Sequence, residues 1–130
     1  IQNGWLIFLD NIWLGIGTAN FRPLCPELVP MELLNGCNNH PHNYYVQVLA
    51  EVGLLGFFAF SLMYILLIKS CWESRHVENA FAKTAFIIPL AFFFPIQTSA
   101  DLFSQWNNSV MWTALALALS AHKIGEMKAN

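Results

Sequence analysis

Residues 42–56 read HNYYVQVLAEVGLLG and join a polar, ionisable head directly to an apolar, helix-forming segment. A proline suits the first position of a helix, so we expect the helix to begin at Pro41. A helix turns about 100° per residue, so Gly53 would lie within roughly 20° of the direction of His42 around the helix axis. Gly56 would lie about 40° away from His42 in the opposite sense, so all three residues would share one face. A glycine within a helix lowers the stability of the helix, so two glycines on this face predict that another helix or a lipid-like ligand approaches it closely. The alternative is that the two glycines only ease helix packing.

The composition indicates lipid rather than water as the main surroundings. Of the 130 residues, 56% are hydrophobic and only 11% are charged, whereas a globular domain carries about 25% charged residues. The formal net charge of -2 excludes a strongly basic surface, so no nucleic-acid partner is expected. The Trp5–Leu9 run lacks a basic segment before it and is followed by Asp10, so it is not read as a signal peptide.

The segment before His42 is predicted to be an external loop, residues 1–41. Residues 1–11 are rich in large apolar side chains and predict a short helix at the membrane interface. Leu14–Asn20 is rich in glycine but has neither a preceding strand nor the lysine of a phosphate loop, so it predicts a structural turn. Residues 21–41 contain four prolines and several Asn and Gly residues. This composition predicts an extended, solvated loop, with one helical turn at Met31–Leu34.

The remaining residues, 42–130, are predicted to form a membrane domain. A span needs about 20 apolar residues, and three stretches approach this length, at about 44–68, 84–100 and 106–121. The first helix is expected to run unbroken from Pro41 to Cys71, with Asn39 or His40 as its N-cap. The predicted fold class is therefore all-α: a multi-pass integral membrane helical bundle with about three transmembrane helices, plus the external loop with its short interfacial helix.

The basic residues predict which side of the membrane each loop occupies. With His42 outside, Arg22 is the only external cation, and the other five basic residues fall on the cytoplasmic side: Lys69, Arg75, Lys83, Lys123 and Lys128. The positive-inside rule favours this orientation over its reverse. In a bacterium the His42 loop would then face the periplasm.

The cysteines fit this orientation. Cys25 and Cys37 both lie in the external loop, where an oxidising compartment permits a disulfide worth about 3 kcal/mol. Cys71 would stay reduced on the inner side. The alternative is a zinc site formed by Cys25, Cys37, His40 and His42, although their spacing matches no compact ligand knuckle. The pairing and the zinc site are both left open at this point.

His42 and Arg22 are the best candidates for chemistry. A neutral imidazole can accept a proton as a general base, and a histidine changes charge near neutral pH. A surface histidine that only hydrogen-bonds the loop is the alternative. The guanidinium of Arg22 can grip a pyrophosphate through paired hydrogen bonds, or it can simply be solvated. His40 is expected to cap the helix or to support His42.

Two acidic residues, Glu51 and Asp101, lie next to apolar segments and are further candidates for the site. Glu51 lies at the start of the apolar run, where we expect its carboxylate to extend toward the lipid headgroups. Asp101 belongs to a polar group that is predicted on the external side and that could face the same cavity as His42. The other members of this group are Gln97, Ser104 and Gln105. The spacing shows no Ser-His-Asp arrangement and no catalytic pair of carboxylates.

The residues at the start of the first span resemble a known family. The signature is His, then Asn, Ser or Gln, then nine residues, then Gly-x-x-Gly, with Thr or Tyr also allowed last; His42, Asn43, Gly53 and Gly56 fill its positions. This is the signature of the bacterial O-antigen ligase and polymerase superfamily. Flanking segments are similar to the same family: Leu14–Phe21, the rest of the helix entered by Tyr44 and Tyr45, and Phe94–Gln97 with Trp106 and Asn107. In that family the motif lies near the C-terminus, so the chain is interpreted as the C-terminal part of a larger multi-span protein.

The resemblance implies a membrane glycosyltransferase. Its donor would be a glycan on undecaprenyl pyrophosphate, and its acceptor lipid A-core or another glycan, in an inverting reaction without metal or other cofactor. His42 would be the catalytic base, while Arg22, Asn43, Gly53 and Gly56 would bind substrate. An O-antigen polymerase or a protein O-oligosaccharyltransferase of the same superfamily is the close alternative. A non-catalytic membrane subunit or a transporter is more distant, because Val52–Ile68 and Thr84–Ala100 contain no Asp, Glu, His, Lys or Arg.

Overall fold

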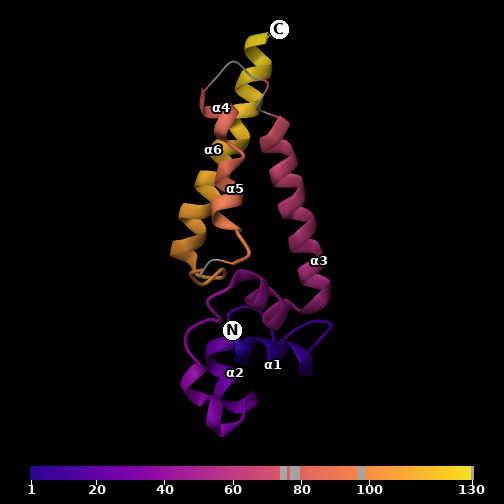
Figure 1. Ribbon diagram of the computed structural model, residues 1–130, viewed down its shortest axis with the longest axis vertical. Coiled ribbons are helices and arrows are strands. Elements are labelled where there is room, and N and C mark those ends of the chain that lie inside the picture. Colours follow the sequence, from indigo (N-terminus) through magenta and orange to yellow (C-terminus); the bar gives the residue numbers. More distant parts are fainter. Residues whose placement is uncertain (74–75, 77–79, 97–98, 130) are drawn as a thin grey trace. The chain divides into compact units, whose positions relative to one another are not determined.

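The computed structural model describes residues 1–73, 76, 80–96 and 99–129, with side chains described as far as Ser120. Over these residues it is helical and contains no strand, which confirms the all-α prediction for the described part of the chain. Arg75 and Gln97 lie outside the described residues, as do the side chains of Lys123 and Lys128. The elements are α1 (Gln2–Asp10), α2 (Phe21–Leu28), η1 (Met31–Gly36), α3 (Tyr44–Glu73), α4 (Ala80–Thr84), α5 (Ile87–Phe92) and α6 (Gln105–Ala129) (Figure 1).

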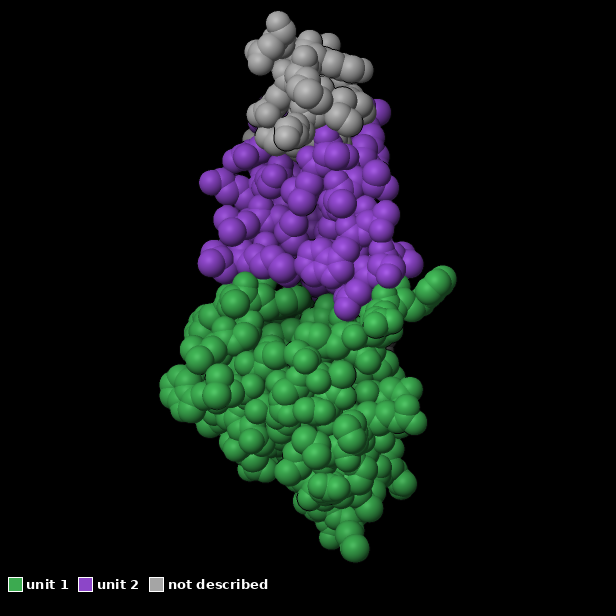
Figure 2. Space-filling view, turned by 180° about the vertical axis from the view of Figure 1, so that it is seen from behind, with its two compact units in different colours: residues 1–60, 95–107 green, residues 61–94, 108–130 purple. Residues whose placement is uncertain are grey.

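The chain divides into two compact units, which Figure 2 shows in different colours. Unit 1 contains residues 1–60 and 95–107, and unit 2 contains residues 61–94 and 108–130. Two elements contribute to both units, because α3 and α6 each pass from one set of residues into the other. The predicted division into an external loop, 1–41, and a membrane domain, 42–130, concerns placement in a membrane and stays a prediction.

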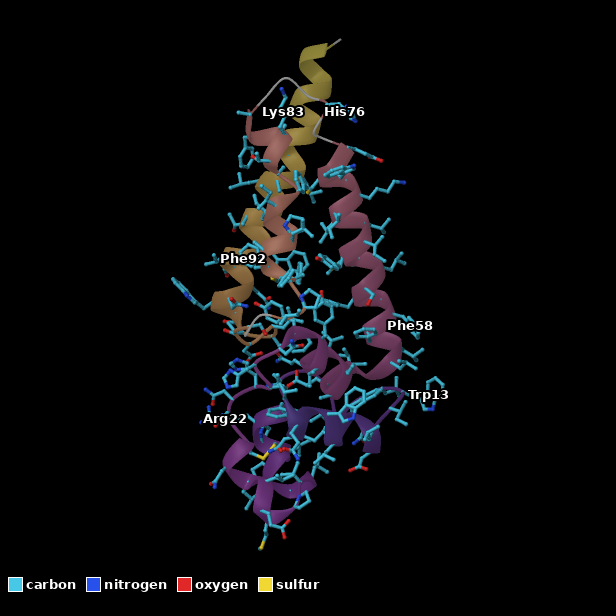
Figure 3. All side chains as sticks on the ribbon, viewed as in Figure 1. Trp13, Arg22, Phe58, His76, Lys83 and Phe92 are labelled. Atoms are coloured by element: carbon cyan, nitrogen blue, oxygen red, sulfur yellow. A yellow bond between two sulfur atoms is a disulfide. The ribbon has the colours of Figure 1, made fainter. Side chains whose placement is uncertain are left out.

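In unit 1, α1, α2 and η1 pack together around a small core (Figure 1). Its buried residues are Ile7, Phe21, Cys25, Val29 and Ala50. A disulfide joins Cys25 to Cys37, the pairing that the sequence left open, and it appears as a yellow bond in Figure 3. The buried amide of Asn3 lies against this bridge and donates to the carbonyl oxygen of Leu33 at 2.8 Å. Helix α1 matches the helix predicted over residues 1–11, and η1 matches the predicted helical turn.

Helix α2 corrects the prediction of an extended loop over residues 21–41. Pro23 lies in the first turn of α2, where backbone N–H groups have no partner within the helix, so this proline removes no hydrogen bond. Pro26 does lie inside the helix, and α2 ends only two residues later, with the N–H of Val29 donating to the carbonyl of Cys25 at 3.1 Å. Prolines thus limited the length of this helix without preventing it.

Helix α3 begins later than predicted and has a different cap. It starts at Tyr44 rather than Pro41, and Asn43 is its N-cap. The side-chain oxygen of Asn43 accepts hydrogen bonds from the N–H groups of Tyr45 (3.0 Å) and Val46 (3.2 Å), the second and third positions of the helix. The expectation that Asn39 or His40 would cap this helix is therefore wrong.

Helix α3 is also broken, at Gly53. This residue has φ 65° and ψ -166°, a conformation essentially restricted to glycine. Residues 12–17 cross the helix here and satisfy the backbone groups that the break leaves free. The N–H groups of Leu54 and Leu55 donate to the carbonyls of Ile12 (2.7 Å) and Trp13 (3.3 Å), while those of Ile16 and Gly17 donate to the carbonyls of Ala50 (3.0 Å) and Glu51 (2.8 Å). The single helical face predicted for His42, Gly53 and Gly56 therefore does not exist, because His42 precedes the helix and Gly53 interrupts it.

Unit 2 contains short helices and parts of longer ones. A small core forms where Cys71, Ala85 and Ala118 are buried together, and the free thiol of Cys71 is inside it. Trp72 packs edge-on against Phe86, with ring centroids 4.9 Å apart. Small residues at such positions allow helices to approach closely.

Among the described residues, α3 is the helix long and apolar enough to cross a membrane, by length and composition. The span predicted at 84–100 is not one helix: α4 and α5 form a shorter apolar segment, and α5 ends at Phe92. Pro89 lies in the first turn of α5, where it removes no hydrogen bond, and Pro95 follows the end of α5, where a proline cannot continue a helix. The span predicted at 106–121 falls within α6. That the chain crosses the membrane more than once stays a prediction.

Candidate active site at the start of helix α3

His42 stands at the junction between the loop and α3. Its side chain is exposed, and its backbone has φ 60°, in the left-handed region. Histidine enters this region more readily than most residues, but the conformation still costs about 1 to 3 kcal/mol and persists only when the surroundings hold it. Here the N–H of Ser99 donates to the carbonyl of His42 at 3.0 Å. The exposed imidazole of His42 is therefore carried by a backbone that is held in an uncommon conformation.

His40 lies beside His42. Their ring centroids are 4.4 Å apart and the ring planes make an angle of 60°, an edge-on contact. The Nε2 atom of His40 is 3.0 Å from the carbonyl oxygen of Ser99, and its Nδ1 atom is buried with no hydrogen-bond partner among the described residues. Pro41, between the two histidines, is buried. The sequence had suggested His40 as a cap or as a partner of His42, and the structure makes it the partner.

Asn43 connects the same loop to the other side of the site. While its side-chain oxygen caps α3, its Nδ2 atom donates to the carbonyl of Pro95 at 2.8 Å. Both functional groups of this amide are therefore occupied by the backbone. Two hydrogen bonds of Ser99, accepted by its carbonyl from His40 and donated by its N–H to the carbonyl of His42, also tie the segment that precedes α6 to the loop that carries His42.

Polar side chains on the first turn of α3 form hydrogen bonds with residues that precede or begin α6. Gln47 is buried; its Nε2 atom donates to the Asp101 carboxylate at 2.6 Å, and its Oε1 atom accepts from the N–H of Leu102 at 3.0 Å. The Nδ2 atom of Asn107 donates to the hydroxyl of Tyr44 at 2.9 Å. The sequence placed Asp101 in a polar cluster near His42, and it does meet the start of α3, through Gln47.

Glu51 is a polar residue whose place differs from the one that its sequence position predicts. Its side chain is buried at 1% exposure and does not extend toward headgroups. Its two carboxylate oxygens accept hydrogen bonds from the N–H groups of Ala19 (2.9 Å) and Phe21 (3.0 Å). The second of these is the first N–H of α2, so Glu51 does for α2 what an N-cap side chain does locally. A lone carboxylate in an apolar stretch two residues before a glycine was the available signal.

Arg22 follows Phe21 in the first turn of α2, and its side chain is exposed, as labelled in Figure 3. The guanidinium of Arg22 is therefore accessible at the surface of unit 1. The bond from Phe21 to Glu51 fixes the start of the helix from which Arg22 extends. The structure therefore brings His42, His40 and Asn43 together and places Arg22 on a separate helix of the same unit.

Gly53 and Gly56 lie further along α3, and the chain itself occupies the space beside each. A Cβ atom on Gly53 would come within 2.5 Å of the carbonyl carbon and oxygen of Trp13, and one on Gly56 within 2.5 Å of a methyl group of Val52. The close approach that the glycines predict is thus real at Gly53, and backbone of the 12–17 segment makes it. Their contact with substrate stays a prediction.

The disulfide bears on the zinc alternative, because Cys25 and Cys37 are bonded to each other and neither thiolate is free to bind a metal. Among the residues that the structure describes, no group of three or more His, Cys, Asp or Glu side chains is arranged to hold a metal ion.

The fold and the site define a helical protein with a membrane-length helix that carries a histidine-bearing polar loop at its N-terminal end. The family model for O-antigen ligases matches residues 1–61. This range contains all four positions of the signature, so the resemblance is confirmed there; Phe94–Gln97 and Trp106-Asn107 lie beyond it. The comparison with curated proteins and the comparison with solved structures each found no match.

Proposed function

We propose that the chain is part of a membrane glycosyltransferase of the O-antigen ligase type, which transfers a glycan from undecaprenyl pyrophosphate to lipid A-core. One observation carries this proposal: within the matched residues, His42 presents an exposed imidazole at the start of the membrane-length helix, on a backbone held in an uncommon conformation. A reactive group that must meet a lipid-linked donor is expected at such a boundary between polar loop and apolar helix.

In the proposed reaction, the neutral imidazole of His42 removes the proton from the acceptor hydroxyl as its oxygen attacks the anomeric carbon. The new bond forms between that oxygen and the anomeric carbon. The bond from the anomeric carbon to the pyrophosphate oxygen breaks, and the electron pair leaves with undecaprenyl pyrophosphate. Attack from the face opposite the leaving group inverts the anomeric configuration. The imidazolium then releases its proton to solvent, which the exposure of His42 permits.

Arg22 is proposed to bind the pyrophosphate of the donor. A guanidinium forms paired hydrogen bonds with phosphate oxygens and stabilises the charge that builds on a leaving pyrophosphate. Its exposure on α2 supports this role, since an exposed guanidinium can reach a phosphate group. Asn43 is proposed to act indirectly, by keeping α3 and the segment at Pro95 in place. Gly53 and Gly56 are proposed to shape the surface against which the donor lipid lies.

The proposed location is the bacterial inner membrane, with several spans and with the His42 loop on the periplasmic face. The apolar helix α3 and the family match support a membrane protein. The side follows from the basic residues, because the arrangement with His42 outside leaves only Arg22 external.

The test uses the full-length protein in a strain that lacks the native gene. His42→Ala is compared with His76→Ala, which changes an exposed histidine of unit 2. Membrane levels are checked by immunoblot, and lipopolysaccharide is separated on a gel. We expect His42→Ala to abolish the polymer ladder while lipid-linked polymer accumulates, and His76→Ala to leave the ladder unchanged.

Two other results would change the proposal. A single-repeat band with His42→Ala would indicate an O-antigen polymerase, which shares the same signature. A full ladder with His42→Ala at normal membrane level would contradict the catalytic role of His42 in lipopolysaccharide assembly.

A further inference from the structure

We propose that His40 is a positioning residue for His42: it holds the His42 imidazole through the ring contact between them. This inference rests on the function proposed above and adds a second residue to the same site. The motif that identifies His42 does not include position 40, so the assignment comes from the geometry of the two rings.

The hydrogen bond of His40 determines which of its nitrogens carries a proton. A carbonyl oxygen only accepts hydrogen bonds, so the Nε2 atom of His40, 3.0 Å from the oxygen of Ser99, must be the donor. This bond fixes the orientation of the ring as well as its protonated nitrogen. The His40 ring therefore has a fixed orientation, and a neighbouring side chain can pack against it.

The backbone around the two histidines is held as firmly. Ser99 accepts from His40 through its carbonyl and donates to the carbonyl of His42 through its N–H, so one residue binds both ends of the His40–His42 segment. Between them, the pyrrolidine ring of Pro41 limits φ, and Pro41 is buried. The relative position of the two imidazoles is consequently set by the backbone and not by chance contact.

The contact matters because little else restrains the His42 side chain, which is exposed. An exposed imidazole rotates among several rotamers, and only some of them direct a ring nitrogen at the acceptor. The edge of the His40 ring, 4.4 Å away between centroids and inclined at 60°, favours one of these orientations. A base that is correctly oriented before substrate arrives raises kcat without changing the affinity for the donor.

Two substitutions separate the ring contact from the hydrogen bond. His40→Phe keeps an aromatic ring beside His42 and loses the bond to Ser99. His40→Gln keeps an N–H donor for the Ser99 carbonyl and loses the ring. His76→Gln, in unit 2, is the matched control. Each is made in the full-length protein and assayed with undecaprenyl-pyrophosphate-linked glycan and lipid A-core purified from the source strain, and each variant's thermal unfolding midpoint is measured.

We expect His40→Gln to lower kcat about tenfold, with KM for the donor unchanged, the size of an effect that an aromatic contact supports. His40→Phe should recover most of that loss, and His76→Gln should match the wild type. If His40→Gln retains the wild-type kcat, or if the two His40 variants lose kcat equally, the positioning role of the ring is overturned. A rise in KM alone would also overturn it.

The failure of the wider proposal gives a different result. If His42→Ala transfers glycan at the wild-type rate in the same assay, the proposed function of His42 fails, whatever the His40 variants do. If His42→Ala is inactive and both His40 variants are normal, only the present inference fails.

Discussion

Gly53 and Gly15 have the clearest physical reason for being glycine. Gly53 adopts a conformation closed to other residues, and Gly15 has φ 66°. A Cβ on Gly15 would lie 2.6 Å from the Glu51 carbonyl oxygen and the Val52 nitrogen, just as a Cβ on Gly53 would meet the backbone at Trp13. The two glycines allow two backbone segments to touch without side chains between them. The contact between the two backbone segments explains why position 53 of the signature is glycine and why position 15, in the Leu14–Asn20 segment, is glycine.

Gly53→Ala should destabilise the protein by about 3 kcal/mol, because alanine is strained at this φ and ψ and its methyl group would overlap the 12–17 segment. Thermal unfolding of the purified full-length protein in detergent, followed by tryptophan fluorescence, measures the loss. Leu55→Ala is the control, since Leu55 is exposed on the same helix. If the two variants unfold at the same temperature, the crossing at Gly53 does not carry the stability assigned to it.

Arg22→Ala should raise KM for the lipid-linked donor at least tenfold and change kcat less, if its guanidinium binds the pyrophosphate in the ground state. The KM of Arg22→Lys should lie between those of the wild type and Arg22→Ala, because an ammonium keeps the charge but not the paired hydrogen bonds. Steady-state transfer with donor from the source strain gives both constants. Glu27→Gln, an exposed change on the same helix, is the control. Unchanged KM and kcat in Arg22→Ala would mean that Arg22 is only a solvated residue, whereas a fall in kcat alone would indicate that it stabilises the leaving pyrophosphate without binding it in the ground state.

At the scale of helices, the sequence predicted those that follow from composition and missed those that depend on distant contacts. The apolar run after Tyr44 and the short first helix were predicted because their side chains alone specify them. Helix α2 was missed because its start is held by Glu51, which lies 30 residues further along the chain than Phe21. The break in α3 was missed for the same reason: hydrogen bonds from residues 12–17 make it tolerable.

The site shows the same division. His42 and Asn43 were found from their positions in a signature, whereas the contacts that hold them involve Pro95 and Ser99, which no local pattern connects to the loop. Asp101 was placed in the right neighbourhood, but its partner Gln47 was not identified. Spacing along a helix predicts which residues share a face; it carries no information on which loop returns to that face.

Glu51→Gln should destabilise α2 by about 2 kcal/mol, since an amide oxygen can replace one carboxylate oxygen but its NH2 group faces a backbone donor. Limited proteolysis of the full-length protein in detergent should then cut more rapidly within residues 18–28, as read by mass spectrometry. Glu32→Gln, an exposed change in η1, provides the comparison. Equal cleavage in both variants would show that Glu51 does not hold the start of α2.

At the scale of the whole chain, the surface of unit 1 indicates where a membrane begins. Trp13 and Phe58 are both exposed, and they extend on the same side of unit 1 in Figure 3. Trp13 belongs to the segment that crosses α3 at Gly53, and the apolar residues of α3 follow directly. Tryptophan is favoured at the boundary between lipid and water. We therefore expect the boundary to lie near Gly53, with the His42 loop on the aqueous side of it.

The orientation across the membrane gives the last prediction. Single cysteines are introduced at Thr18, in the predicted external loop, and at Lys83, in the predicted cytoplasmic loop; both positions are exposed. The background replaces Cys71 and any cysteine outside these 130 residues with serine, and keeps Cys25 and Cys37, which are bonded to each other. In spheroplasts, a membrane-impermeant maleimide should label Thr18→Cys at once and Lys83→Cys only after the membrane is opened with detergent. The positive-inside rule requires this pattern if Lys69 and Lys83 are cytoplasmic. Labelling of Lys83→Cys in intact spheroplasts would mean that the orientation is opposite to the predicted one. The His42 loop would then lie in the cytoplasm, where a periplasmic transferase does not act.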